Sequence, residues 1–255
     1  MTASQHKVIS LTRLKIACQD CSLKEICLPV GVGINEIEML DDIIERKKPL
    51  SKGENLYRIG DSFKSIFAVR SGSLKSICTT EAGEVQITGF HLPGELVGMD
   101  AIADNIHPVS TIALETTSVC EIPFEQLDKL SEKLSGLRHE ILRVMSREIK
   151  EDQQNMLMLG QKTAEEKLAA LLMSISKRHK TRGFSPLEFT LTMSRGDIGN
   201  FLGLALETVS RLFGRFQDDG LITVNRKQIT ILNHYSLCAL AGAGCLHEDS
   251  PVEKR

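Results

Sequence analysis

No stretch of this chain is apolar for long enough to cross a membrane. An α-helical span needs about 20 consecutive apolar residues, whereas charged residues make up 25% of the sequence and interrupt its apolar runs. The first nine residues also lack the apolar core of a secretory signal. We therefore expect a cytoplasmic protein that has no membrane partner.

The sequence also lacks the short motifs of common enzymes. It contains no P-loop, no G-x-S-x-G nucleophile elbow and no H-E-x-x-H zinc motif. Its 7 histidines are scattered without ligand spacing. His91 and His107 do not form the close His-x-His pair that metal oxygenases built on a β-roll usually carry. The sequence thus predicts a protein that is not an enzyme.

The charges that are present are unevenly distributed. The 255 residues suffice for one large or two ordinary domains, and their net charge is −2. The segment 161–232 carries 11 Lys and Arg against 7 Asp and Glu, a net charge of +4, whereas residues 1–160 carry 18 against 23. This balance favours a polyanion-binding module near the C-terminus, attached to a body that does not bind polyanions.

Three of the 7 cysteines lie close together, at Cys18, Cys21 and Cys27. Cysteines of cytoplasmic proteins are metal ligands or buried thiols more often than disulfides. Thiolates at such short spacings hold Zn²⁺ or an iron–sulfur cluster, and the spacing does not separate the two. Either group needs a fourth ligand from elsewhere in the chain. Outside this group, we expect the thiols of Cys78, Cys238 and Cys245 to be inert.

The segment 47–124 has the pattern of short strands separated by turns. Glycines recur between β-type runs at positions 53, 60, 72, 83 and 94. This spacing predicts an antiparallel roll or barrel, with strands at 65–69, 74–78 and 85–90. A short amphipathic helix is expected ahead of it, at 34–44.

A long helical segment is expected from Pro123 to Gly160, because no proline interrupts it after its start. Residues within it recur at the alternating spacing of a coiled-coil seam. The seam comprises Leu142, Met145, Ile149, Asp152 and Met156. The alternative is a helix that packs on its own β-domain. Asp152 favours a marginal dimer interface, because two such carboxylates would face each other across a dimer axis.

The C-terminal third contains a helix-turn-helix pattern. Ser194 and Asp197 match a capping box, with a hydroxyl at the N-cap and a carboxylate three residues later. The helix that they start ends at Gly203, which can adopt the left-handed conformation of a tight turn. A second helix is expected at 206–218, and a hairpin with a basic tip at 221–231 forms a wing. A generic helical hairpin would not combine these features.

The second helix presents polar residues near its N-terminal end. Glu207, Ser210 and Arg211 lie at i, i+3 and i+4, on the face that enters the major groove of DNA in a helix-turn-helix. Arginine can chelate guanine, glutamate can accept a hydrogen bond from cytosine, and serine can bond a base or a phosphate. Arg195 and Arg215 are expected to contact phosphates. The predicted partner is double-stranded DNA.

The order of β-roll, long helix and winged helix-turn-helix resembles the cyclic-AMP receptor/FNR superfamily of bacterial transcription regulators. The passage 191–216, LTMSRGDIGNFLGLALETVSRLFGRF, is similar to the recognition motif of its oxygen-sensing FNR branch, and the resemblance covers nearly the full chain. It implies an α+β fold with an antiparallel β-roll of the cyclic-nucleotide-binding type. It also implies a homodimer that binds palindromic promoter DNA, close to TTGAT-N4-ATCAA, and RNA polymerase.

The FNR branch holds its cluster with three clustered cysteines and a distant one in a Val-Cys-Glu-Ile-Pro context, which here is 119–123. The resemblance therefore implies that Cys18, Cys21, Cys27 and Cys120 ligate a 4Fe–4S cluster. The cluster form would dimerise and bind DNA without oxygen. Oxygen would convert the cluster to a 2Fe–2S form and release the DNA. A structural zinc ion at the same cysteines, in a regulator of the same fold, is the alternative.

Residues around these sites have candidate supporting roles. Arg138 and Asp128 are candidates for an ion pair near the start of the dimer helix. Asp20, Ser22 and Ile26, between the ligands, are expected to tune the access of solvent and oxygen to the cluster.

Cyclic nucleotides are not expected as effectors. Cyclic-nucleotide sensors of this superfamily hold the cyclic phosphate with an arginine near the end of the roll. The corresponding stretch here, 105–110, has none, and no arginine occurs between Ser71 and Leu137. A buried phosphate would lack its bidentate partner.

These expectations divide the chain into five parts. They are a cluster-binding arm (1–30), a β-roll sensor domain (31–135), a dimerisation helix (136–160), a winged helix-turn-helix domain (161–240) and a tail (241–255).

Overall fold

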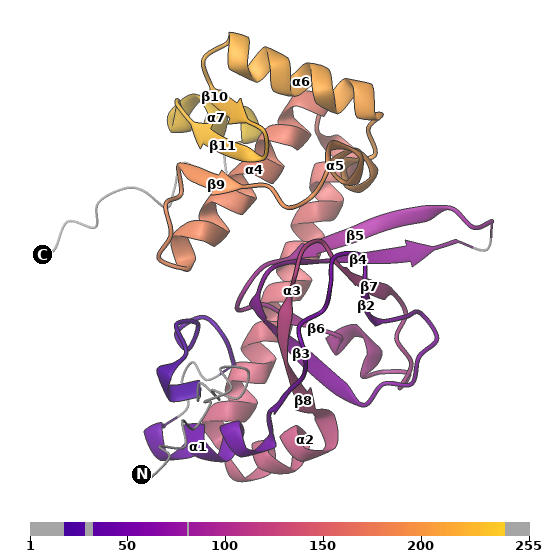
Figure 1. Cartoon of the computed structure of the whole chain (residues 1–255), viewed down its shortest axis with the longest axis vertical. Coiled ribbons are helices and arrows are strands. Elements are labelled where there is room, and N and C mark those ends of the chain that lie inside the picture. The colour runs from indigo at the N-terminus through magenta and orange to yellow at the C-terminus, as the bar shows by residue number, and fades with distance from the viewer. Residues whose placement is uncertain (1–17, 29–32, 81, 243–255) are drawn as a thin grey trace, which may run out of the picture.

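The computed structural model describes residues 18–28, 33–80 and 82–242, so Cys245 and most of the tail lie outside the described residues. A β-rich domain forms the lower half of Figure 1 and a mostly helical domain the upper half, with the long helix α3 (Ser135–Gln161) running between them. This arrangement confirms the predicted α+β fold of β-roll, long helix and winged helix-turn-helix. Within the described ranges, no helix is long and apolar enough to span a bilayer.

The roll consists of two four-stranded antiparallel sheets. Its strands are β1 (Glu45–Arg46), β2 (Asn55–Tyr57), β3 (Ser65–Ser71), β4 (Leu74–Thr79), β5 (Val85–His91), β6 (Leu96–Val97), β7 (Ser110–Ala113) and β8 (Ser118–Pro123). One sheet has the order β1-β8-β3-β6 and the other β2-β7-β4-β5. The turn between β3 and β4 requires Gly72, because its φ is 78° and a Cβ there would lie 2.5 Å from the carbonyl oxygen of Thr116.

Short helices complete the N-terminal half. They are the 3-10 helix η2 (Cys18–Asp20), α1 (Ile34–Ile43) and the 3-10 helix η3 (Met99–Ala101). The amphipathic helix predicted at 34–44 is therefore confirmed. Its buried residue Leu40 belongs to the same core as Leu28 of the arm, Ile66 of β3 and Ile122 of β8. The arm thus packs on the β3–β8 side of the roll.

The segment predicted as one helix from Pro123 to Gly160 is two helices, so the expectation of a continuous helix was wrong. The first, α2 (Phe124–Lys133), ends at Leu134, whose extended backbone (φ −110°, ψ 95°) separates it from α3. Leu130, Leu134 and Leu137 are all buried in the core of the roll. Helix α2 packs on β3 and β8 of the roll, whereas α3 runs on between the two domains.

The C-terminal domain has the predicted reader architecture. Its elements are α4 (Ala164–Thr181), β9 (Glu188–Thr190), α5 (Arg195–Leu202), α6 (Leu206–Asp218), β10 (Ile222–Asn225), β11 (Gln228–Ile231) and α7 (His234–Ala241). The backbone N–H of Asp197 donates to the Ser194 hydroxyl over 3.0 Å, which confirms the capping box of α5. Gly203 ends α5 in the left-handed conformation, with φ 66°. The hairpin β10–β11 forms the wing.

The core of the C-terminal domain continues into the roll. Apolar residues of α4, α5 and α6 form one buried cluster with Ile87 and Phe90 of β5. The Phe90 and Phe201 rings lie with their centroids 5.2 Å apart. The two domains are therefore packed against each other and are not joined only by α3.

Candidate functional site

The four predicted cysteine ligands line one cavity. Cys18, Cys21 and Cys27 face it from the arm, and Cys120 faces it from β8. Most of the remaining lining is apolar, from side chains such as Leu28 of the arm, and two basic residues, Lys24 and Arg70, complete it. The structure therefore brings together residues that are about 100 positions apart in the sequence.

Local hydrogen bonds fold the arm so that its thiols face the same way. The amide of Cys21 donates to the carbonyl of Cys18 over 3.3 Å, and that of Cys27 donates to the carbonyl of Leu23 over 2.9 Å. Ile26 packs on Gly94 of the roll, where an added Cβ would lie 2.7 Å from the Ile26 side chain. Asp20 and Ser22 between the ligands are exposed, whereas Ile26 is partly buried.

Asp41 connects the two parts of the cysteine set, a role that the sequence reasoning missed. Its carboxylate accepts a hydrogen bond from the backbone N–H of Cys18 over 3.1 Å. The same carboxylate forms an ion pair with Arg46 of β1. Arg46 in turn is the register partner of Cys120 in the β1–β8 pairing. Burial opposes the charge on Asp41, but its contacts with Arg46 and Cys18 outweigh burial and lower its pKa.

Burial favours the protonated form of the Cys18 and Cys27 thiols. Burial, with added repulsion from Asp41 and Cys120, raises the pKa of Cys18 to about 12. Burial likewise raises the pKa of Cys27 to about 12, with Cys120 and Cys21 adding to the effect. Among the described residues no three potential ligands stand close enough to hold a metal ion as they are. Four sulfur donors around one largely apolar cavity nevertheless fit the donor set of a zinc ion or an iron–sulfur cluster, and either would bind with loss of the thiol protons.

The predicted seam of α3 lies largely on the surface of the chain. Leu142, Ile149 and Met156 are 59%, 58% and 72% exposed. Asp152 lies among them and is also exposed, whereas Met145 packs partly against the core of the roll. These exposed apolar side chains do not pack on the chain's own β-domain, and the role of this stretch in a dimer interface stays a prediction.

The expected ion pair near the start of the dimer helix does not form within the chain. Arg138 and Asp128 are both described and both exposed, and no ion pair joins them. The pairs nearby are Lys129 with Glu125 and Arg143 with Glu140. A role for Arg138 or Asp128 stays a prediction.

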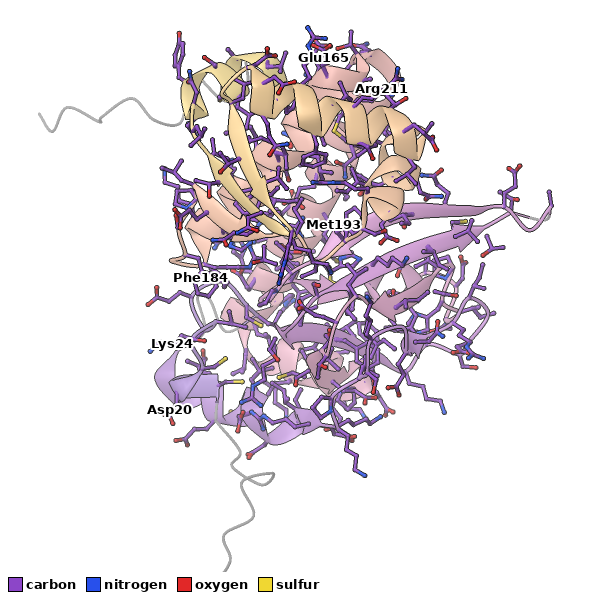
Figure 2. The ribbon with its side chains drawn as sticks, turned by 45° about the horizontal axis from the view of Figure 1, so that its top comes forward. Asp20, Lys24, Glu165, Phe184, Met193 and Arg211 are labelled. Atoms are coloured by element: carbon purple, nitrogen blue, oxygen red, sulfur yellow. The ribbon has the colours of Figure 1, made fainter. Side chains whose placement is uncertain are left out.

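The residues predicted to read bases lie on the surface of α6, and their role stays a prediction. Glu207, Ser210 and Arg211 are all exposed on α6, and Figure 2 places Arg211 at the opposite end of the molecule from Asp20 and Lys24 of the arm. The core residues of α6, such as Val209, are buried. The face of α6 that carries Arg211 is thus free to meet a groove of DNA.

The two predicted phosphate contacts differ in their surroundings. The guanidinium carbon of Arg195 lies 3.1 Å from the centre of the Phe213 ring, and burial lowers its pKa to about 10. Arg195 therefore faces the protein, and a phosphate contact needs it to leave that ring. Arg215 is exposed and forms an ion pair with Glu165 of α4.

Sequence reasoning also missed an apolar residue on the DNA-facing end. Leu206 begins α6, directly before Glu207, and is 49% exposed. An exposed apolar side chain at this position can contact the methyl group of thymine.

Comparison with known proteins decides the family. Residues 191–222 match the model of bacterial regulatory proteins of the crp family, and residues 47–133 match the cyclic nucleotide-binding domain. The transcriptional activator protein anr of Pseudomonas aeruginosa is 57% identical over 88% of this chain and 92% of its own length. The fumarate and nitrate reduction regulatory protein of Escherichia coli is 56% identical over 89% and 91%.

The chain belongs to the CRP/FNR family of transcription regulators. Among solved structures, FixK2 from Bradyrhizobium japonicum is similar with a TM-score of 0.72 and 28% identity, over 79% of this chain and 98% of that one. The resemblance inferred from the sequence is confirmed, and so is the prediction that this CRP/FNR protein is a regulator and not an enzyme.

Proposed function

We propose that this CRP/FNR protein is an oxygen-responsive, cytoplasmic transcription regulator whose four cysteines hold a 4Fe–4S cluster. The observation that carries the proposal is the shared cavity of Cys18, Cys21, Cys27 and Cys120. A cluster there would bind the arm to β8, directly before α2 and the dimer helix. The cluster-loaded protein would form a homodimer through α3 and bind a palindromic DNA site with its two α6 helices.

Several features support iron and sulfide over zinc. Several relatives that cover most of this chain carry the name fumarate and nitrate reduction regulatory protein, and the FNR branch that the sequence resembles holds such a cluster. The cavity lining is largely apolar, which suits a cluster whose access to solvent and oxygen is controlled by the residues around it. A structural zinc ion has no redox chemistry of its own, so it would not itself respond to oxygen.

A cyclic nucleotide is not the proposed effector, although the roll matches a cyclic nucleotide-binding domain. In the 105–110 stretch, the ring of His107 stacks on Tyr57 with centroids 3.8 Å apart, and the Ser110 hydroxyl accepts a hydrogen bond from the backbone N–H of Ile59. These side chains are engaged within the roll, and the stretch offers no arginine to a phosphate.

Visible spectroscopy of anaerobically purified protein tests the proposal. We expect a broad absorption band with bound iron and sulfide, and bleaching of that band in air. A colourless protein that contains stoichiometric zinc would overturn the cluster in favour of the zinc-binding regulator. Cys120→Ala should abolish the band, whereas Cys78→Ala, a matched change on β4 outside the cavity, should retain it.

RNA polymerase is the protein partner that this function requires. An activator of this family acts when bound beside a promoter. A reconstituted transcription assay, run with and without oxygen, therefore measures its action on RNA polymerase. We expect oxygen-sensitive transcription from a promoter that carries the palindrome. Transcription that is equal in air and without oxygen would contradict the proposal.

A further inference from the structure

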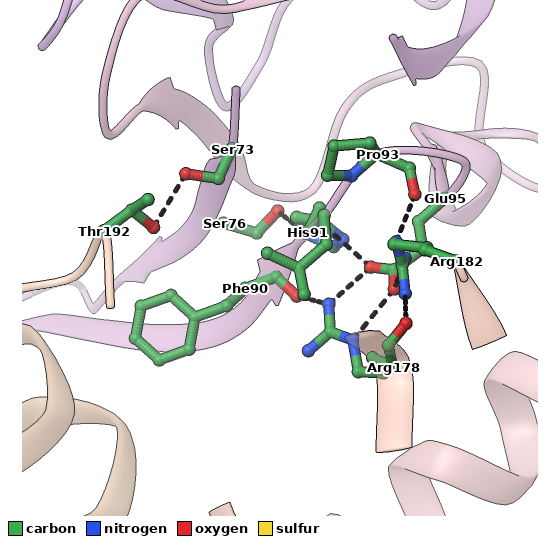
Figure 3. A network of polar contacts seen from close by, with 10 residues as sticks. Ser73, Ser76, Phe90, His91, Pro93, Glu95, Arg178, Arg182 and Thr192 are labelled. Carbon is green, nitrogen blue, oxygen red and sulfur yellow. Dashed lines mark hydrogen bonds and ion pairs between the residues drawn. The ribbon is translucent and has the colours of Figure 1, made fainter. Parts of the chain in front are cut away.

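A cluster of charged residues joins the roll to the C-terminal domain. From the last turns of α4, the Arg178 Nε donates to the Glu95 carboxylate over 2.8 Å, and its Nη2 donates to the carbonyl of Phe90 over 2.6 Å. Arg182 donates to the carbonyl of Pro93 over 2.5 Å and also pairs with Glu95. Figure 3 shows both guanidinium groups converging on Glu95, which lies between β5 and β6.

These charges are held away from solvent. The side chains of Arg182, Arg178 and Glu95 are 5%, 21% and 29% exposed. Burial alone would raise the pKa of Glu95, but the two arginines outweigh it and lower that pKa to about 2. Removing Glu95 would leave two largely buried guanidinium groups without their shared carboxylate, which is destabilising between the domains.

A second group of contacts joins the roll to the helix that precedes α6. Lys75 of β4 pairs with Asp197 over 2.5 Å, and Asp197 is also the capping residue of α5. On the next strand, the backbone N–H of Ile87 donates to the Asn200 side chain over 2.5 Å, and Asn200 donates to the carbonyl of Val85 over 2.7 Å. The register of the β4–β5 pair shifts beside Ile87, so its N–H is available to Asn200.

The roll thus contacts both α4 and α5, the two helices on which α6 packs. We propose that Glu95, Arg178 and Arg182 are positioning residues that fix the orientation of the winged helix-turn-helix on the roll, and thereby set the distance between the two α6 helices of a DNA-bound dimer. The half-site spacing that a dimer accepts is a geometric consequence of that distance. The inference rests on the proposed dimer on palindromic DNA.

The test combines hydrogen exchange with a spacing series of DNA. Glu95→Gln, Arg178→Gln and the double variant are compared with Glu125→Gln, which breaks an exposed pair on α2 outside the interface. Exchange at the Ile87 amide is followed in the metal-free protein, where neither cluster nor DNA is needed. Affinity is then measured anaerobically on palindromes whose half-sites stand at the native spacing or one base pair nearer or farther.

We expect faster hydrogen exchange at the Ile87 amide in Glu95→Gln and Arg178→Gln, and unchanged exchange in Glu125→Gln. The preference for the native spacing should fall by about tenfold, within the coupling measured between residues in direct contact. A variant that is only partly folded would bind all of the DNA sites more weakly by the same factor, and its preference for the native spacing would remain. The double variant should resemble Glu95→Gln, because that change already removes the pair of Glu95 with Arg178, whereas Arg178→Gln alone leaves the pair of Glu95 with Arg182.

Native spacing preference together with native exchange at Ile87 in these variants would overturn the proposal. If Arg178→Gln does not fold, Arg178→Lys keeps the charge but loses the bidentate geometry, and it should relax the spacing preference to a smaller extent. Faster exchange in the variants, combined with no DNA binding by the unchanged protein, would instead refute the proposed function and leave the positioning of the domain supported.

Discussion

Residues near the cysteine cavity can position the predicted ligands without being ligands themselves. Asp41 illustrates this, because one carboxylate bonds the amide of Cys18 and the guanidinium of Arg46, whose strand lies beside Cys120. Sequence reasoning found the three clustered cysteines from their spacing, and it reached Cys120 only through a family resemblance. It could not find Asp41, because a carboxylate on an amphipathic helix has the same pattern whether it faces solvent or a ligand.

Asp41→Asn should weaken cluster binding. The amide oxygen can still accept from Cys18, but the ion pair with Arg46 is lost, and partners of metal ligands typically contribute about 10- to 100-fold to affinity. Iron and sulfide content after anaerobic reconstitution measures the effect. Asp42→Asn, on the exposed neighbour, is the control. Equal cluster content in the two variants would show that Asp41 does not position the arm.

Arg211→Ala should relax the choice of one base pair. A bidentate contact between arginine and guanine contributes about 1–3 kcal/mol of discrimination. Affinities for the palindrome and for its single-base variants measure this loss. Arg215→Ala is the comparison, since a lost phosphate contact weakens all sequences alike and reduces the salt dependence. Uniform weakening by Arg211→Ala would argue against base reading by this residue.

At the scale of elements, the sequence predicted the helix ends, turns and strands that depend on residues close together in the chain. The capping box at Ser194, the turn at Gly203 and the strands β3, β4 and β5 follow from local chemistry and were predicted closely. The break at Leu134 was missed, because the choice between one helix and two depends on where the roll lies. The pairing of Glu95 with Arg178, 83 residues away, was missed for the same reason.

The helix α3 should dimerise in air when its seam loses Asp152. Two copies of this carboxylate would repel each other across the dimer axis, and its pKa is raised by burial even within one chain. Asp152→Ala removes the repulsion, so we expect a dimer in air by analytical ultracentrifugation. Glu132→Ala, an exposed change on α2, should remain monomeric. A monomeric Asp152→Ala protein would contradict the assignment of the seam.

The acidic face of α3 should also make stability depend on pH. Burial, followed by repulsion from Asp152, Asp100, Glu151 and Glu95, raises the pKa of Glu148 from 4.5 to about 8. The folded chain therefore binds this proton more tightly than the unfolded chain. Its free energy of unfolding should fall as pH rises from 4.5 to about 8, by the linkage between protonation and folding.

Denaturant titrations across this pH range measure the effect. Glu148→Gln should lessen the fall, since the amide does not titrate. Glu132→Gln, on an exposed residue of α2, should keep the pH dependence of the unchanged protein. An identical slope in Glu148→Gln would show that Glu148 is not the titrating group.

At the scale of the whole molecule, the cysteine cavity and α6 lie at opposite ends, so the proposed cluster would act on α6 through the elements between them (Figures 1 and 2). The structure offers a path through Cys120 on β8, the α2–α3 bend at Leu134, the α3 seam and the contacts between roll and C-terminal domain. Under the proposed function, each step would need only a small displacement of a packed element, which suits a marginal dimer interface.

The most direct test of this account is the DNA affinity of anaerobic protein before and after removal of its iron. Binding to the palindrome and the oligomeric state are measured for the loaded protein, for protein stripped of iron without oxygen, and for protein exposed to air. The account predicts that only the loaded protein is a tightly binding dimer. Equal affinity of the iron-stripped, oxygen-free protein for the palindrome would contradict it.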